Sequence, residues 1–300
     1  MKKLSIQLVL IILALASCTR VIDVDIEGQS ETRLVVEGGV FFYENNPDST
    51  YQSIRLTTSK SYFSDPNQVP SLSGATVSVT DLTTSAVYLY VESATEAGVY
   101  ETNTLKAEMG TSYKLNIKAE LDGIEQDFEA VSTIERHCPK MDSVFLDFEK
   151  SFFDDESGYY IMYSMTQDST VSDFFYFQTF LDGELLEDNY DNPNFYNSLF
   201  DDVFFDAFID SMVVVNPWIL EEEETPPFHL RIKLNNLNKV DYDYLHRTLE
   251  NKVGGSDTPA VEIKSSVKNK TFPKRYAFGM FYCSAQHEVQ RLIEAYPPKE

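Results

Sequence analysis

Polar and apolar residues alternate along several short segments in the first half of the chain. These segments are rich in β-branched and aromatic residues and span 33–43, 51–59, 75–81 and 86–93. Alternation with a period of two is typical of strands that bury one face. Asp122-Gly123 separates two further segments of this kind and suits a two-residue hairpin turn, whose central residues need positive φ. The pattern predicts an antiparallel, immunoglobulin-like β-sandwich domain at residues 18–135.

The alternation breaks at the sequence RHCPKMD (136–142), where a proline interrupts it, and we place a domain boundary there. At residues 136–300 we expect a second β-rich domain with one or two short helices. Its expected strands span 143–153, 158–166, 173–181, 184–186, 228–237 and 275–284. Asp182-Gly183 gives a second hairpin signal. The chain is therefore predicted to be mostly β, with two domains after its first residues.

A helical period replaces the alternation at residues 240–253. Asp241 can cap the start of this helix, and the glycine pair that follows can end it. Its apolar stripe consists of Tyr242, Leu245, Leu249 and Val253. The segment AQHEVQRLIEA (285–295) is expected to close the chain as a second helix. The acidic, aromatic segment 187–211 fits either a short amphipathic helix or a loop with brief strands.

The first eighteen residues have the layout of a bacterial lipoprotein signal. Two lysines precede an apolar stretch, residues 4–15, which is shorter than the ~20 residues needed to cross a membrane. Leu15-Ala16-Ser17-Cys18 then resembles a lipobox, whose cysteine is lipidated before cleavage in front of it. We therefore predict a signal peptide at residues 1–17 and lipidation of Cys18, which would anchor the protein permanently. The alternative is an ordinary secretory peptide with an incidental cysteine.

The expected location is the cell outer membrane, with the protein held there by its lipid. Acidic residues lie close behind Cys18, at Asp23, Asp25 and Glu27, and they resemble the surface-export signal of Bacteroidota lipoproteins. The net charge is −24, and it becomes −26 when residues 1–17, with their two lysines and no acid, are removed. Nucleic acid binding needs the opposite sign, so we exclude it as a main role.

A family resemblance extends over most of the chain. The segments that carry it are VIDVDIE, RLVVEGGVFF, LSGATVSVTD, AGVYETN, GTSYKLNIKAELDG, DYDYLHRTL and FGMFYCSA. In this order they resemble the Bacteroidota outer-membrane lipoproteins of domain-of-unknown-function family 4249. The resemblance implies an outer-membrane lipoprotein that is often paired with a TonB-dependent receptor. It implies no particular activity or ligand.

Sequence signatures of enzymes are nearly absent. The chain has no G-x-S-x-G, H-E-x-x-H, P-loop or G-x-G-x-x-G motif. Ser265 and Lys268 match S-x-x-K, but they lie in a segment that reads as a strand rather than a helix. The acidic segment 187–211 lacks the spacing and the glycine of an EF-hand loop. We therefore expect no catalytic residue, no metal site and no cofactor.

Three interpretations compete for the remaining cysteines, Cys138 and Cys283. The first is a disulfide, which an oxidising compartment favours and which would stabilise the fold by closing a long loop. The second is a zinc site, in which Cys283 and His287 share a helical face and Cys138 or His137 completes the set. The third is a pair of buried, unpaired thiols.

Runs of aromatic residues at 41–43, 174–177 and 204–205 place large rings on both faces of an element. One face normally supplies the core, so the other must pack against the other domain, a partner or a ligand. With the receptor supplied by the family resemblance, we expect a non-catalytic binding or accessory subunit of a TonB-dependent nutrient importer. The alternatives are a structural or secretion-accessory scaffold of the envelope, and a surface hydrolase that uses a carboxylate pair.

Overall fold

The computed structural model of this chain is mostly β, as the alternation predicts. It describes residues 31–59, 69–150, 157–165, 173–185, 199–201, 213–220, 225–253 and 265–298. The predicted signal peptide and the lipidation site Cys18 lie outside these residues. So do Phe204, Phe205 and all of the segment 187–211 except residues 199–201.

The N-terminal half contains seven strands. They are β1 (Leu34–Tyr43), β2 (Gln52–Thr58), β3 (Thr76–Asp81), β4 (Val87–Glu92), β5 (Val99–Thr102), β6 (Ser112–Leu121) and β7 (Ile124–Thr133). Six of them coincide with predicted strands, and only β5, which is too short for alternation to be recognised, was not expected. Asp122 and Gly123 have φ angles of 54° and 75°, which confirms the predicted hairpin turn between β6 and β7.

The C-terminal half adds nine strands and a helix to the described part of the chain. They are β8 (Met141–Lys150), β9 (Ser157–Met165), β10 (Phe174–Leu181), β11 (Glu184–Leu185), β12 (Leu199–Asp201), β13 (Val213–Leu220), β14 (Phe228–Leu237), α3 (Lys239–Val253), β15 (Lys268–Asn269) and β16 (Phe278–Ile293). The second predicted hairpin, at Asp182-Gly183, is confirmed between β10 and β11. Strand β13 was not predicted, whereas β12 is a brief strand within the segment 187–211, as one of the two alternatives for that segment allows.

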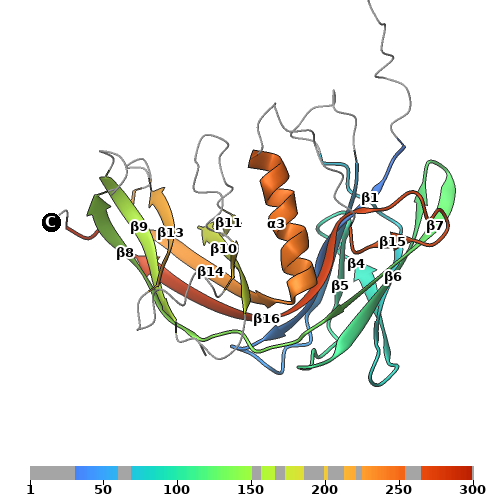
Figure 1. The fold of residues 1–300 in the computed structure, drawn as a ribbon, viewed down its shortest axis with the longest axis horizontal. Coiled ribbons are helices and arrows are strands. Elements are labelled where there is room, and N and C mark those ends of the chain that lie inside the picture. Colours follow the sequence, from blue (N-terminus) through green and yellow to red (C-terminus); the bar gives the residue numbers. More distant parts are fainter. Residues whose placement is uncertain are drawn as a thin grey trace, which may run out of the picture.

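Most strands belong to one continuous sheet. Their order is β11-β10-β14-β16-β1-β2-β5-β4-β3-β6-β7-β15, with β12 beside β10. Figure 1 shows that this sheet is strongly curved and that α3 stands on its concave side. A second sheet, with the order β13-β9-β8, lies at the far end from β7.

The strand β16 corrects one prediction. Residues 285–295 were expected to form a helix, but residues as far as Ile293 continue the strand, and nine of them pair with β14, from Ala285–Asn236 to Ile293–Phe228. The spacing of Val289, Leu292 and Ile293 resembles a helical period. Pairing with a neighbouring strand overrides this local preference, because strand formation depends strongly on tertiary context.

The first half of β16 pairs with a different strand. Its residues from Phe278 to Gln286 run parallel to β1, from Val35 to Tyr43. A single strand therefore connects the N-terminal strands to β14 and β10. The division into domains at residues 18–135 and 136–300 stays a prediction.

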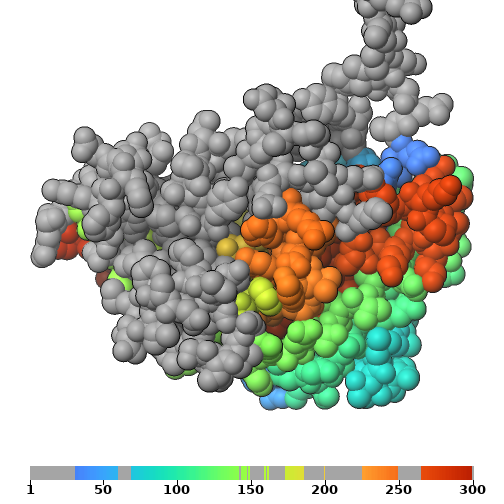
Figure 2. All heavy atoms as spheres, in the orientation of Figure 1, coloured from blue at the N-terminus to red at the C-terminus, as the bar shows by residue number. Residues whose placement is uncertain are grey.

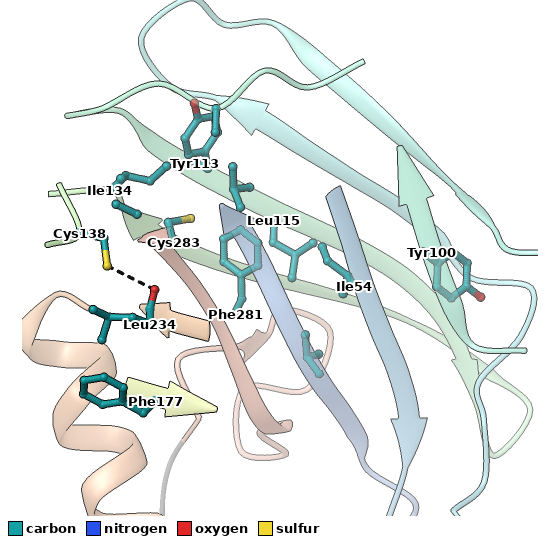
Figure 3. Packing of buried hydrophobic residues seen from close by; sticks show 14 of the residues in the cluster. Ile54, Tyr100, Tyr113, Leu115, Ile134, Cys138, Phe177, Leu234, Phe281 and Cys283 are labelled. Carbon is teal, nitrogen blue, oxygen red and sulfur yellow. Dashed lines mark hydrogen bonds between the residues drawn. The ribbon is translucent and has the colours of Figure 1, made fainter. Parts of the chain in front are cut away.

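The core lies between two layers in the N-terminal half, as predicted for a sandwich. Figure 3 shows side chains from both layers meeting there: Ile54 of β2, Leu115 of β6 and Phe281 of β16. All three are almost completely buried. The same core continues under β10 and β14, where Phe177 and Leu234 belong to it. Burial of so many large apolar side chains is the main stabilising contribution to the fold.

The helix α3 begins one position before the predicted range, and its cap is not the predicted residue. The side-chain oxygen of Asn238 accepts a hydrogen bond from the backbone N–H of Asp241 (2.9 Å), so Asn238 is the N-cap. Asp241 lies in the first turn and accepts a hydrogen bond from Asn238 in return (2.6 Å). No helix in the described ranges is long and apolar enough to cross a membrane.

Candidate binding surface

Cys138 and Cys283, which the sequence offered as a disulfide, a zinc site or buried thiols, are buried core residues. Cys138 donates a hydrogen bond from Sγ to the backbone oxygen of Leu234 (3.3 Å), as Figure 3 shows, and Cys283 lies in the same core. Both thiols are free, so the candidate disulfide is not formed in this structure. Burial raises the pKa of both thiols well above its usual range. Such thiols are poor nucleophiles and poor metal ligands, because both roles need the thiolate.

The residues of the candidate zinc site are not brought together. Cys283 and His287 lie on the strand β16 rather than on a helix, so four residues of extended chain separate them by ~13 Å. His137 Nδ1 is 2.9 Å from Glu44 Oε1, and His287 Nε2 is 3.4 Å from Asn45 Nδ2. Within the ranges that the structure describes, no group of three or more His, Cys, Asp or Glu side chains could hold a metal ion.

The S-x-x-K pair does not form a reactive arrangement either. Ser265 Oγ donates to the backbone oxygen of Gly279 (2.6 Å) and accepts from the backbone N–H of Val267 (3.0 Å). Lys268 is exposed at the start of β15. Because its hydroxyl hydrogen is engaged with a backbone carbonyl, Ser265 stabilises a turn.

The aromatic run of β10 uses both faces of the strand. Phe175 and Phe177 are buried in the main core. Phe174 and Tyr176 point to the opposite face and pack with Tyr242 of α3, and the rings of Phe174 and Tyr242 are 4.9 Å apart. In Figure 2 the orange atoms of α3 adjoin the yellow atoms of β10. The second face therefore packs against α3, which lies within the same predicted domain rather than in the other one.

Beyond α3 the same face of the sheet becomes polar. We call this part the polar face, and it consists of Gln178 and Phe180 on β10, Arg231 and Lys233 on β14, and Glu288 and Gln290 on β16. The strand register places these residues beside one another: Phe180 is opposite Arg231, Gln178 is opposite Lys233, and Lys233 is opposite Glu288. The alternate residues of β14, such as Ile232 and Leu234, are buried in the core behind them.

The two cations of the polar face share one aromatic ring. The guanidinium carbon of Arg231 is 4.2 Å from the centre of the Phe180 ring, and Lys233 Nζ is 5.2 Å from it. Both cations are partly exposed. Burial and the nearby positive charge of Arg231 lower the pKa of Lys233. Among the described residues, no carboxylate lies within ion-pair distance of either cation.

Lys239 shows the more usual arrangement. Its ammonium nitrogen also lies over a ring, that of Phe174, at 5.5 Å. However, it is paired with Asp243 one helical turn away, at 2.8 Å. The Lys239 ammonium on its aromatic ring is therefore paired with a carboxylate on α3, whereas neither cation of the polar face forms an ion pair within the described part of the chain.

Buried hydrogen bonds fix the edge of the polar face nearest α3. Asn235 is completely buried, and its side-chain oxygen accepts from Gln286 Nε2 (2.9 Å) and from Ser284 Oγ (3.2 Å). Its amide nitrogen donates to the backbone oxygen of Tyr176 (3.3 Å). These bonds join β10, β14 and β16 through side chains in addition to the backbone ladder. The polar face therefore rests on a rigid support, which a selective binding site requires.

The sequence places this chain in a known family. Residues 19–290 match the family model described as "Domain of unknown function (DUF4249)". The chain belongs to the DUF4249 family. The resemblance noted in the sequence is thus confirmed for the family itself. The DUF4249 match extends from the residue after Cys18 to Gln290, so it includes all six residues of the polar face.

Among solved structures, this DUF4249 chain is similar to the FN1–FN3 domains of chicken CNTN1. The two share 13% sequence identity with a TM-score of 0.24, and the similarity covers 68% of this chain and 60% of that one. The DUF4249 chain therefore spans less than two thirds of that structure. No curated protein matches the sequence.

The polar face was missed by reasoning from sequence alone. Arginine and lysine alternate with buried residues in the segment HLRIKL of β14, so their common face could have been predicted from the alternation. Their contact with Phe180 could not, because it depends on the register between β10 and β14.

Proposed function

We propose that this protein is a non-catalytic outer-membrane lipoprotein, exposed at the cell surface, that serves as a binding or accessory subunit of a TonB-dependent nutrient importer. The observation that carries the proposal is the lipobox-like sequence ending at Cys18, directly before the DUF4249 match begins at residue 19. Lipidation of Cys18 would hold the folded part of the chain at the membrane without a transmembrane segment.

The geometry favours binding over catalysis. The thiols and the S-x-x-K serine, which sequence analysis raised as candidates for chemistry, are buried or bonded to backbone. The polar face offers charged, amide and aromatic side chains on a rigid sheet, which are the groups that orient a bound ligand.

Isolation of the intact protein from gently solubilised outer membranes tests the proposal. We expect a β-barrel receptor to be recovered with it, and we expect the variant Cys18→Ala to leave the membrane fraction after washing with high salt. Recovery without any barrel receptor would contradict the importer role. Retention of Cys18→Ala in the washed membrane would contradict the lipid anchor.

An exposed apolar stripe favours a second candidate function, a structural or secretion-accessory scaffold. Val87, Leu89 and Val91 on one face of β4 are 60%, 66% and 71% exposed, and such stripes often mark protein contacts. A scaffold would have a constitutive protein partner, and small molecules would not change its thermal stability. Measurement of the melting temperature with and without candidate ligands separates the two functions.

A further inference from the structure

The polar face has a positive net charge, whereas the whole chain is strongly acidic. The protein has 48 acidic and 24 basic residues, so carboxylates are available to pair with almost any cation. Arg231 and Lys233 nevertheless lie side by side on β14 over the ring of Phe180. Two neighbouring, partly buried positive charges repel each other and lose hydration. An anion placed between them would relieve both costs.

The local charge limits which anion fits. Glu288 lies opposite Lys233 on β16, beyond ion-pair distance but close enough to raise the pKa of the lysine. Two cations and one carboxylate leave a net charge of +1. A single carboxylate would balance this charge, whereas a phosphate dianion would exceed it. The planar guanidinium of Arg231 also matches the two oxygens of a carboxylate.

The neighbouring side chains favour a ligand that carries hydroxyl groups. Gln178 lies opposite Lys233, and Gln290 lies opposite Arg231. Each amide both donates and accepts hydrogen bonds, and Glu288 accepts them. The carboxylate oxygens of the ligand would face the two cations, and the hydroxyl groups would face the two amides and Glu288.

From this arrangement we infer that the polar face binds a hydroxylated monocarboxylate, the chemical class of the sugar acids. Arg231 and Lys233 hold the carboxylate, Phe180 positions the two cations, and Gln178, Gln290 and Glu288 select the hydroxyl pattern. This inference rests on the proposed binding function and adds the class of ligand to it.

Calorimetric titration of the full chain, purified in detergent, with galacturonate and with its neutral counterpart galactose tests the inference. We expect galacturonate to bind and galactose to bind at least about tenfold more weakly, because only the acid pairs with the cations. Inorganic phosphate is the third probe, and we expect it to bind more weakly than galacturonate. Equal binding of acid and neutral sugar, tighter binding of phosphate, or no binding of galacturonate at millimolar concentration would overturn the inference.

Four substitutions locate the site. Arg231→Gln with Lys233→Gln should lower the affinity for galacturonate by at least about tenfold, since both charged contacts are lost. Glu288→Gln should raise the affinity, because the glutamine oxygen still accepts a hydrogen bond from a ligand hydroxyl group while the negative charge near the ligand's carboxylate is removed. Lys239→Gln is the matched control: this lysine also lies over an aromatic ring but is paired with Asp243, so its loss should leave the affinity unchanged. The opposite pattern, with Lys239→Gln as damaging as the double variant, would contradict the site.

The Glu288→Gln result does not depend on the double variant being folded, so the inference remains testable if that variant is unstable. A fall in affinity with Glu288→Gln would count against it. The experiments distinguish failure of the proposed importer role from failure of the inferred ligand class. Loss of the barrel receptor from the pull-down, with galacturonate binding intact, contradicts only the importer role, whereas recovery of the receptor without galacturonate binding contradicts only the ligand class.

Discussion

At the scale of single residues, Asp241 is a buried carboxylate held by a network of hydrogen bonds. Its carboxylate is buried and accepts hydrogen bonds from Ser132 Oγ (2.7 Å) and from Asn238 Nδ2 (2.6 Å). Ser132 also accepts a hydrogen bond from the backbone N–H of Cys283 (2.9 Å). The network therefore joins β7, α3 and β16. Burial outweighs these hydrogen bonds and raises the pKa of Asp241 from 3.8 to about 6.

This pKa predicts how stability changes with pH. The carboxyl group is easier to protonate in the folded state than in the unfolded chain, so its stabilising effect is complete below pH 3.8 and is lost as the pH rises through about 6. A shift of two pKa units corresponds to ~3 kcal/mol. Asp241→Asn cannot ionise and should lack this contribution. Urea unfolding of both proteins between pH 4 and pH 7 measures the difference, and parallel pH profiles would contradict the prediction.

The two buried thiols lead to a second prediction at this scale. Cys138 and Cys283 should not react with a thiol reagent in the folded protein, because the core excludes the reagent and burial holds both groups protonated. After unfolding without a reductant, two thiols should react per chain, since a lipidated Cys18 has no free thiol. A count near zero in the unfolded, unreduced protein would instead show the disulfide between Cys138 and Cys283.

At the scale of elements, the pairing of β1 with β16 depends on two glycines. A Cβ atom on Gly279 would overlap the backbone oxygen of Val36, and one on Gly39 would overlap the backbone oxygen of Tyr282. The two backbones therefore approach more closely than any residue with a side chain allows. Gly279 also has a φ of 72°.

Gly110 gives a matched comparison, because it has the same φ of 72° but a Cβ atom added to it would meet only open space. Gly110→Ala should therefore cost only the strain of the left-handed conformation, about 1 kcal/mol. Gly279→Ala should cost several times more, because β1 and β16 must also separate. Chemical denaturation of both variants measures the two losses. Equal losses would show that the close approach contributes nothing.

The sequence alone predicted strands and turns correctly where the local pattern of residues is enough to define them. The alternation in segments such as 112–121 and the Asp-Gly turns at 122–123 and 182–183 located strands and hairpins correctly. It failed for residues 285–293, because the neighbours that make them a strand lie on β14, far away in sequence. The polar face was missed for the same reason, since its six residues come from three strands whose register no local pattern contains.

At the scale of the whole molecule, β16 connects parts that a domain boundary near residue 136 would separate. It pairs with β1 over its first half and with β14 over its second half. The Arg291 guanidinium also donates to the backbone oxygen of Val144 on β8 (2.9 Å). Loss of β16 would therefore remove a neighbour from both halves of the chain.

Deletion of residues 278–300 should prevent both halves from folding. The expected result is loss of the β-sheet signal in circular dichroism and rapid proteolysis throughout the chain, because β1 and β14 would each expose an unpaired edge. Deletion of residues 297–300, which lie beyond β16, is the control and should leave the fold intact. A protease-resistant fragment at residues 31–135 in the longer deletion would instead support an independent N-terminal domain.

The position of β16 also determines when the fold can be completed. Asn45, just after β1, accepts a hydrogen bond from the backbone N–H of Glu288, 243 residues later in the chain. Contacts this distant in sequence form slowly, because closing the long intervening segment costs conformational entropy before the contact can stabilise the fold. A polypeptide made from its N-terminus cannot pair β1 with β16 until residues 278–286 have been synthesised. For any protein that crosses a membrane unfolded, such a late closing contact keeps the chain in a form that can still be exported.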